Sequence, residues 1–267
     1  MTEKFTHLVL TRFNTAVGYA PWARRLDSKW LESRLVFFER YCFPSMAAQR
    51  GAHFDWIVFC DMNSPNWFRE KMASFEPLVR PFYVDGWLTD ERIANTLAEA
   101  GLVLTPYLIT TRLDNDDALA SHHLAAVQSA FHEQDREFVE FPLGIQSFRG
   151  HLYTVYWPSN PFLSLIEKVG KGNQFTTVCS VRHDQVRSAG KICSLMRTPQ
   201  WLQLLHGDNL GNTLRGWPRL KSRGHPDFGV LWPAMEQHDS LPQRMLFSAA
   251  AYGDRAKRWL IRHASSA

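Results

Sequence analysis

Cysteine is scarce in this sequence, because the 267 residues contain only four: Cys42, Cys60, Cys179 and Cys193. No two of them form a CxxC pair, the spacing that zinc sites and dithiol redox motifs use. A framework of disulfides is not indicated either, since such frameworks are typical of short secreted chains. The pattern favours buried or incidental thiols in a reducing compartment.

Long apolar runs are also missing. No segment approaches the roughly 18 consecutive apolar residues that a membrane-spanning helix needs. The N-terminal stretch from Met1 to His7 lacks the apolar core of a secretory signal. Both absences predict a cytoplasmic protein.

Neither charge is in strong excess, with 30 Lys and Arg against 26 Asp and Glu. The formal net charge of +4 is too small to indicate a nucleic-acid partner without a localised basic patch. One basic, amphipathic segment does occur, from Arg255 to His263. It fits a solvated helix face, the favoured interpretation, or peripheral contact with the inner face of an anionic membrane.

A group of carboxylates directly follows an apolar, β-branched run. Residues 108–113 read LITTRL, and Asp114, Asp116 and Asp117 come next. Adjacent carboxylates repel one another unless a cation lies between them, and Mg²⁺ or Mn²⁺ held by one or two carboxylates keeps positions open for substrate phosphates. The cluster favours a nucleotide-handling enzyme with a divalent cation. The alternative is a solvated N-terminal cap of the following helix, although three carboxylates exceed what a cap needs.

Strand and helix patterns alternate up to and beyond this cluster. The sequence predicts strands at 8–13, 54–61 and 79–84 and a fourth ending at the cluster, with helices at 28–43, 65–75, 89–100 and about 117–133. Asp27 or Ser28 and then Ser64 are the expected caps of the first two helices. Such alternation is typical of a mainly parallel α/β sheet. Ligands of these sheets bind at the carboxyl ends of the strands, where Asp61, Asp85 and the carboxylate cluster lie.

The pattern changes after Arg136. Residues 138–148 and 151–157 predict an antiparallel hairpin through Arg149-Gly150. Turn residues dominate from there on, with a short helix expected at about 199–205 and a terminal helix from Leu241. Because no linker or repeat interrupts the chain, we expect one domain with a loop-rich C-terminal third.

Five further blocks accompany the carboxylates. They are LTRFN at 10–14, FFERYCFPS at 37–45, TTRLD at 110–114, NPFLSLIE at 160–167 and WLQLLHGDN at 201–209. Together with LDNDDAL at 113–119, which is similar to a DxD motif, they resemble the bacterial rhamnosyltransferase family of GT-A glycosyltransferases. The resemblance spans roughly residues 8–216. It implies a GT-A-like (Rossmann-like) mixed, mainly parallel sheet flanked by helices.

The resemblance also implies roles for the acidic residues. In GT-A enzymes the DxD carboxylates hold Mn²⁺ or Mg²⁺, which bridges the diphosphate of a nucleotide-sugar. Asp116 is then the expected metal ligand, Asp114 contacts the ribose or reaches the metal through water, and Asp117 adds a ligand or caps the next helix. A C-terminal histidine completes the metal sphere of this fold. His206 is the expected one, with His183 as its competitor.

Nucleotide-binding roles are expected at other strand ends. Asp61 matches the position that accepts a hydrogen bond from the nucleobase, and an ordinary strand-end turn residue is the equal alternative. Arg12 is expected to meet the nucleotide, with a surface ion pair as alternative. Arg112 lies in an otherwise apolar strand, so it needs a partner such as the neighbouring carboxylates or a diphosphate.

The sequence does not single out a general base, which an inverting transferase needs to deprotonate its acceptor. Members of this fold usually carry an acidic pair for that purpose, and no Glu-Asp dipeptide occurs in the expected region. Asp184, Glu167 and Asp208 are the candidates. Glu167 is alternatively a core-edge residue of a helix.

The expected function is that of a metal-dependent glycosyltransferase, which moves a sugar, rhamnose being one option, from a nucleotide-diphosphate donor to a glycan or lipid-linked acceptor. The expected domain spans 1–267, with a nucleotide-sugar-binding half at 1–135 and an acceptor-side half at 136–267. One alternative is a nucleotidyl or phosphoryl transferase using the same carboxylates. It is disfavoured because only Val17-Gly18-Tyr19, rather than a Gly-rich phosphate loop, follows the first strand. The other alternative is a catalytically inactive, glycan-related binding module.

Overall fold

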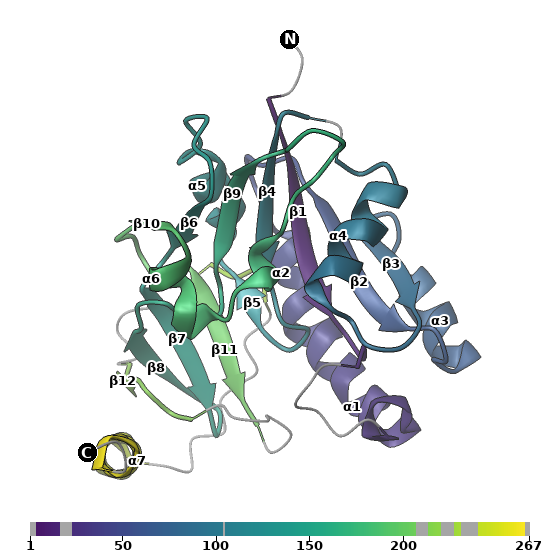
Figure 1. The fold of residues 1–267 in the computed structure, drawn as a ribbon. Coiled ribbons are helices and arrows are strands. Elements are labelled where there is room, and N and C mark those ends of the chain that lie inside the picture. The colour runs from purple at the N-terminus through teal and green to yellow at the C-terminus, as the bar shows by residue number, and fades with distance from the viewer. Residues whose placement is uncertain are drawn as a thin grey trace.

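A seven-stranded sheet forms the centre of the fold (Figure 1). The structure, a computed structural model, describes residues 4–16, 23–103, 105–206, 213–219, 227–230 and 240–264. In spatial order the strands are β10 (Lys191–Ser194), β6 (Glu137–Glu140), β9 (Ser164–Lys168), β4 (Tyr107–Arg112), β1 (Phe5–Arg12), β2 (Asp55–Asp61) and β3 (Val79–Val84). Strands β3, β2, β1 and β4 are parallel neighbours, whereas β9 is antiparallel to β4 and β6. The prediction of a mixed, mainly parallel sheet is confirmed.

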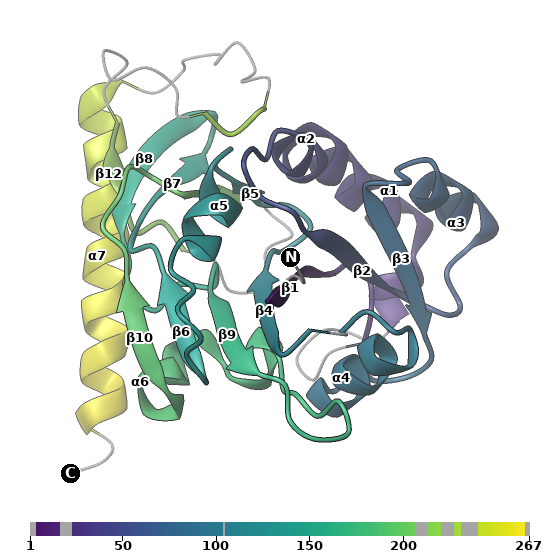
Figure 2. The same cartoon turned by 90° about the horizontal axis from the view of Figure 1, so that it is seen from above.

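Helices cover both faces of this sheet (Figure 2). On one face lie α1 (Ser28–Phe37), the π-helix η2 (Phe38–Cys42), α2 (Phe43–Ala47) and α3 (Asn66–Ala73). On the other lies α4 (Asp90–Glu99), whose Ile93 and Leu97 pack against Leu8 and Leu10 of β1. Apolar residues on both faces of the parallel strands are what such a three-layer arrangement requires.

The helix starts follow capping chemistry, with one correction. Asp27 caps α1, because its carboxylate accepts a hydrogen bond of 2.9 Å from the Trp30 N–H. Ser64 does not cap α3. Pro65 holds the cap position, and the Ser64 hydroxyl instead donates to the Asp61 carbonyl over 2.7 Å. The side chain is therefore used to close the turn after β2.

The predicted helix at 117–133 is wrong in its first half. Residues Ala118–Leu119 form strand β5, and the helix α5 spans only His123–Gln128. Strand β5 pairs antiparallel with β11 (Trp201–Leu205), which replaces the short helix predicted at 199–205. An apolar run buried on all sides shows no periodicity that separates strand from helix, so the pairing of two such runs decided both elements.

A second sheet, in the order β12-β8-β7-β11-β5, packs beside the first. The predicted hairpin is confirmed as β7 (Leu143–Phe148) and β8 (His151–Tyr156), joined through Arg149 and Gly150 with φ of 48° and 71°. The first predicted strand, however, divides at Phe141-Pro142, because proline lacks the N–H that a central ladder needs. Its first part becomes β6 of the large sheet.

The remaining elements lie before α1 and in the part of the chain from Val178 onward. They are η1 (Ala23–Leu26) near the N-terminus and then η3 (Val178–Ser180), η4 (His183–Gln185), α6 (Val186–Ala189), β12 (Trp217–Pro218) and α7 (Leu241–Ala264). The terminal helix predicted from Leu241 is confirmed, and Figure 2 shows it along the outer side of the second sheet. Arg244 and Arg255 turn inward, toward the carbonyls of Leu152 and Leu214. Within the described residues, no helix combines the length and apolarity that crossing a membrane requires.

Candidate functional site

Three polar side chains from distant parts of the chain meet just after β4. Oδ2 of Asp116 lies 2.9 Å from Nη1 of Arg34 and 2.9 Å from Nε2 of His206. Nη1 of Arg34 also lies 3.3 Å from Nε2 of His206. The three side chains are 7%, 11% and 12% exposed, respectively. Two of the residues expected to hold a metal, Asp116 and His206, are therefore in direct contact, and the guanidinium of Arg34 contacts both.

Each member of this Arg34–Asp116–His206 cluster is held by its own element. His206 directly follows β11, and its ring stacks on Phe37 of α1 with centroids 4.1 Å apart and planes at 15°. Arg34 lies on α1 and also donates to the side-chain oxygen of Asn115. The amide of Asn115 in turn donates to the Phe13 carbonyl over 3.0 Å. The loop after β4 is thus fastened to both β1 and α1.

Asp117 turns away from the cluster. Its Oδ1 accepts a hydrogen bond of 3.0 Å from the Leu204 N–H, which ties the start of β5 to β11. Burial raises the pKa of Asp117 well above its ordinary value, and the charges of Asp116 and Asp114 raise it further. The cap alternative for Asp117 is wrong, because His122 holds the N-cap position of α5 and no side-chain bond is made there.

Asp114 is the solvent-facing carboxylate of the group, with 35% of its side chain exposed. Its Oδ2 lies 3.1 Å from Nη2 of Arg112, the partner that the sequence required for a cation in this strand. Burial acts to raise the pKa of Asp114, but the charges of Arg112 and Arg12 outweigh it and lower the pKa. The lowered pKa keeps Asp114 ionised. The side chains of Arg12 and Arg112 place two positive charges at the carboxyl ends of β1 and β4.

The donor set can be compared with the needs of a metal. Among the residues that the structure describes, no three His, Cys, Asp or Glu side chains are arranged to hold an ion. Asp116 and His206 converge, Asp114 is exposed nearby in sequence, and oxygen and imidazole donors suit Mg²⁺ or Mn²⁺ with substrate phosphates completing the sphere. The residues fit such an ion if the guanidinium of Arg34 moves away from Oδ2 of Asp116 when the ion binds.

Asp61 ends β2 as predicted, but both its oxygens already hold protein groups. Oδ2 accepts from Nε of Arg25 over 2.7 Å, and Oδ1 accepts from the Asn63 N–H over 2.8 Å. The carboxylate is fully buried. A nucleobase contact of Asp61 stays a prediction, and the geometry gives it a second task as the counter-ion of a buried arginine.

Of the three acidic candidates for the general base, Glu167 lies far from the carboxylate cluster. Glu167 lies in β9 rather than in a helix and pairs in register with Leu108, six residues before Asp114. Six residues of strand amount to roughly 20 Å, and both Glu167 oxygens accept from Thr176 and Thr177. The structure does not bring Glu167 to the site.

Asp184 lies on η4 at the surface. Its Oδ2 is 2.9 Å from Nη2 of Arg182, and this hydrogen bond is the main cause that lowers the pKa of Asp184. Asp208 lies outside the described residues.

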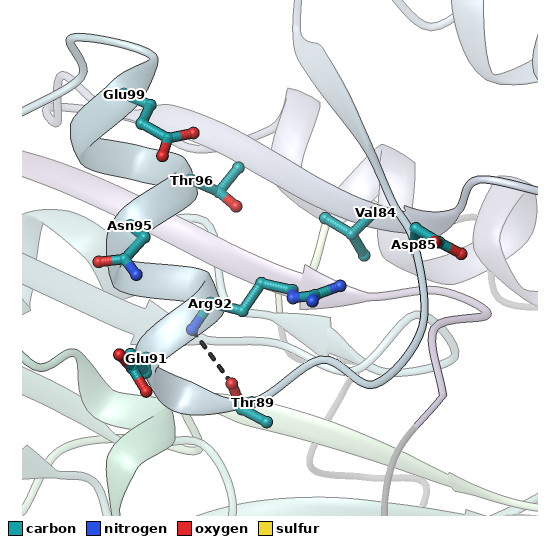
Figure 3. Close-up of a pocket in the computed structure, with 8 residues that line it drawn as sticks. All are labelled: Val84, Asp85, Thr89, Glu91, Arg92, Asn95, Thr96 and Glu99. Atoms are coloured by element: carbon teal, nitrogen blue, oxygen red, sulfur yellow. Dashed lines mark hydrogen bonds between the residues drawn. The ribbon is translucent and has the colours of Figure 1, made fainter.

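A polar cavity of about 490 Å³ opens between α4 and the end of β3 (Figure 3). Thr89, which caps α4 through the Arg92 N–H, and the Arg92 side chain lie on its wall. The walls are completed by Val84, Asp85, Glu91, Asn95, Thr96 and Glu99. Asp85, one of the strand-end carboxylates noted in the sequence, lines this cavity, whereas no member of the Arg34–Asp116–His206 cluster or of the Arg112–Asp114 pair does.

Comparison with known sequences supplies the family. A sequence model of a family described as "Putative rhamnosyl transferase" matches residues 7–216. The chain belongs to this family. The resemblance seen in the sequence blocks is thereby confirmed, and the matched range includes every member of the Arg34–Asp116–His206 cluster. A search of curated proteins finds no similar sequence.

Solved structures give distant similarities to this member of the rhamnosyl transferase family. Residues 1–349 of S. aureus TarS in complex with UDP-GlcNAc match with 10% identity and a TM-score of 0.48, over 78% of this chain and 60% of that one. The chain thus spans about 60% of the length of that TarS structure. A nucleotide-diphospho-sugar transferase from Desulfovibrio desulfuricans G20, described as putative, matches with 11% identity and a TM-score of 0.38, over 76% and 81% of the chains.

Sequence reasoning missed Arg34, Asn115 and Phe37. A signal for Arg34 was present, since it stands between Leu31 and Leu35, which helical spacing places on the buried face of α1. A cation at the edge of such a face needs a partner. No comparable signal marks Phe37, because its contact with His206 depends on how α1 and β11 pack.

Proposed function

We propose that the protein transfers a sugar from a nucleotide-diphosphate donor to a hydroxyl group of a glycan or lipid-linked acceptor. Rhamnose is one option for the sugar. The observation that supports this best is the convergence of Asp116 and His206 beside the Arg112–Asp114 pair, at the carboxyl edge of the parallel strands. In parallel α/β sheets that edge is where ligands bind.

The diphosphate is proposed to lie against Arg12 and Arg112. Both residues end a parallel strand, and the positive charges of both lower the pKa of Asp114. Guanidinium groups bind phosphate oxygens through paired hydrogen bonds. On binding, Arg112 would exchange part of its contact with Asp114 for the donor, which leaves that carboxylate available to a cation.

Asp114, Asp116 and His206 are proposed to hold Mg²⁺ or Mn²⁺ together with donor phosphate oxygens. When bound, the ion offsets the charge that develops on the departing nucleoside diphosphate. Asp117 is not proposed as a ligand, because its carboxyl oxygen is committed to the backbone of β11. Burial and the charges of Asp116 and Asp114 raise its pKa, which favours the uncharged form and so reduces repulsion within the group.

The protein is further proposed to act at the cytoplasmic face of a membrane through α7. Met245, Leu246 and Tyr252 are exposed on this helix, and Lys257 is exposed one turn further on. Apolar side chains beside cations are typical of helices that lie on anionic lipid surfaces. The replacement Leu246→Glu should weaken co-sedimentation with anionic vesicles, and equal recovery of variant and wild type would count against the contact.

Calorimetric titration with UDP-, dTDP- and GDP-sugars, each with and without Mn²⁺, tests the proposed function. One of these donors should bind, more tightly with the ion. Asp116→Asn, which keeps the shape of the side chain but not its charge, should remove the gain from Mn²⁺ and cut transfer by about 100-fold, the scale of losing one electrostatic contact to the reacting centre.

The matched control is Asp55→Asn, an exposed carboxylate that pairs with Arg80 at the far end of β2. It should bind and turn over the donor as the wild type does. No nucleotide binding by the wild type under any condition would favour a binding module instead. Full Mn²⁺ dependence in Asp116→Asn would contradict the proposed metal site.

A further inference from the structure

His183 is a histidine that the proposed site has not used. It opens η4, and its Nδ1 lies 2.7 Å from the carbonyl oxygen of Ser159. A carbonyl only accepts, so Nδ1 carries the proton and Nε2 carries the lone pair of a neutral ring. Within the described part of the chain, Nε2 makes no hydrogen bond, and the residue is half-buried. The ring thus presents an oriented, unused basic nitrogen.

The ring is also held by packing. Trp157 meets it edge to face, with centroids 5.7 Å apart and planes at 86°. Trp157 is itself covered by the guanidinium of Arg215 at 4.1 Å. These contacts and the Ser159 bond fix the imidazole from two sides, as general acid–base groups need.

The segments on both sides of His183 are attached near the carboxyl end of β4, and the ring lies close enough to Arg112 for that charge to lower its pKa. The loop that carries Ser159 reaches β4 at Leu163, whose carbonyl accepts from the Arg112 N–H over 3.0 Å. The segment before η4 is attached to the same strand, because the Val178 N–H donates to Oγ1 of Thr110 over 2.7 Å. In Figure 1 this green segment, between β9 and α6, passes over β4.

The charges around His183 keep it neutral. Burial is the main cause that lowers its pKa below the ordinary 6.5, and the charges of Arg112 and Arg215 lower it further. The Ser159 bond and Asp184 act in the opposite direction. Its neighbour Asp184 is a weaker base, since the exposed pair with Arg182 lowers the pKa of that carboxyl.

We propose that His183 is the general base that activates the acceptor hydroxyl. This rests on the transferase function proposed above. The acceptor oxygen forms a bond to the anomeric carbon of the donor while its proton passes to Nε2 of His183. The bond from that carbon to the phosphate oxygen breaks, and its electron pair leaves with the nucleoside diphosphate. A single displacement of this kind inverts the anomeric configuration.

The variant His183→Asn tests this assignment. The Asn amide still donates toward the Ser159 carbonyl, so the loop contact is kept, but the basic nitrogen is lost. The value of kcat should fall by about 10²–10⁴-fold, the usual contribution of a general base, while KM for the donor and the Kd for nucleotide stay unchanged. The acidic limb of the wild-type profile of kcat/KM, expected below pH 6.5, should disappear.

His132→Gln is the matched control. His132 makes the same kind of contact, with Nδ1 3.0 Å from the Ala130 carbonyl, but it is exposed beyond α5. Its replacement should leave kcat and the pH profile unchanged. Thermal unfolding of all variants checks that they fold, and His183→Gln provides a second substitution if the Asn variant is unstable.

Three outcomes would overturn the assignment. They are a kcat in both His183 variants within a few fold of wild type, loss of the acidic limb in Asp184→Asn but not in His183→Asn, and a product that retains the anomeric configuration. Failure of the proposed function looks different, because the wild type would then bind no nucleotide-sugar. Without donor binding there is no transfer reaction, and the protein then needs no general base.

Discussion

Nε2 of His206 lies 2.9 Å from Oδ2 of Asp116, although 90 residues separate them in the chain. The imidazole has a second fixed neighbour in Phe37, on which it stacks at 4.1 Å. A polar contact and a stacking contact on one ring leave it little freedom to rotate. The pair is therefore organised before any ligand arrives, and such preorganisation is what electrostatic stabilisation in an active site relies on.

In the proposed metal site, Arg34→Ala should raise the affinity of Asp116 and His206 for a cation, because it removes the guanidinium that occupies Oδ2 of Asp116. Removing one partner of a buried ion pair costs about 3–5 kcal/mol of unfolding free energy, and the lower end applies because the guanidinium keeps some exposure. Mn²⁺ should then raise the Tm of the variant more than that of the wild type, since ligand binding to the native state is stabilising. Thermal unfolding with and without Mn²⁺ measures both effects.

The control for this experiment is Lys71→Ala, which breaks the exposed pair between Lys71 and Glu39. Exposed pairs contribute about 0–1 kcal/mol, so this Tm should change little and should respond to Mn²⁺ as the wild type does. If Mn²⁺ stabilises the wild type as much as Arg34→Ala, the guanidinium does not compete with a cation.

Asp61→Ala should destabilise the fold because it removes the carboxylate that pairs with the buried Arg25 guanidinium. The pair is nearly inaccessible to solvent, with side chains 7% and 0% exposed. The unfolding free energy should drop by about 3–5 kcal/mol in urea denaturation. Arg80→Ala, which breaks the exposed pair between β3 and Asp55 of β2, should cost at most about 1 kcal/mol. Similar losses of unfolding free energy in the two variants would contradict a larger contribution from the buried Arg25–Asp61 pair.

Gly144→Ala should strain the second sheet. A Cβ at this position would lie 2.1 Å from the ring of Trp201, and that ring is fixed by stacking on Phe162 at 4.9 Å. Overpacking of this kind costs about 1–3 kcal/mol, measurable by urea unfolding. Gly253→Ala provides the contrast, since among the described residues an added Cβ would meet nothing within 4 Å beyond its chain neighbours and the helix's own backbone, and the helix should gain about 0.5–1 kcal/mol. An unchanged unfolding free energy in Gly144→Ala would contradict the tight packing of β7 against the Trp201 ring of β11.

Acid should destabilise the protein through buried histidines. Burial, followed by the charge of His123, lowers the pKa of His7 to about 3, whereas the unfolded value is 6.5. His123, with a pKa lowered to about 4, acts in the same window. Both stay neutral in the native state while the unfolded chain takes up protons. Their stabilisation is therefore complete above pH 6.5 and is lost as the pH falls toward 4.

The expected slope is about 1.4 kcal/mol per pH unit for each histidine once its unfolded form is mostly protonated. Urea unfolding between pH 6.5 and 4 measures it. The variant His7→Gln should show a shallower decline, and the exposed His132→Gln should follow the wild type. Parallel declines in His7→Gln and wild type would contradict a neutral, buried His7.

The parallel strands were predictable because their signal is local. Runs such as 54–61 and 79–84 are mostly apolar and end in turns or carboxylates, so each marks a strand without reference to the rest of the chain. The second sheet was not predictable in the same way. Trp201 to Leu204 is buried on all sides, and the pattern of such a run is the same for a strand and a helix.

The candidate site shows the same division. The carboxylates and their place at a strand end can be taken from residues 108–117, and the family blocks indicated His206. The sequence offered three acidic bases, whereas the geometry points to His183. Its proposed role depends on a carbonyl 24 residues earlier and on Arg112 of another element.

The sequence by itself determined the alternation of strands and helices, the edge at which Asp114 and Asp116 appear, and membership of the rhamnosyl transferase family. These features follow from the spacing of apolar residues along the chain and from short motifs of neighbouring residues. Only the tertiary structure decided that Arg34 joins Asp116 and His206, that Asp117 faces β11, and that Glu167 lies far from the site. Those facts depend on contacts between distant segments, which arise from packing and hydrogen bonding that no local pattern encodes.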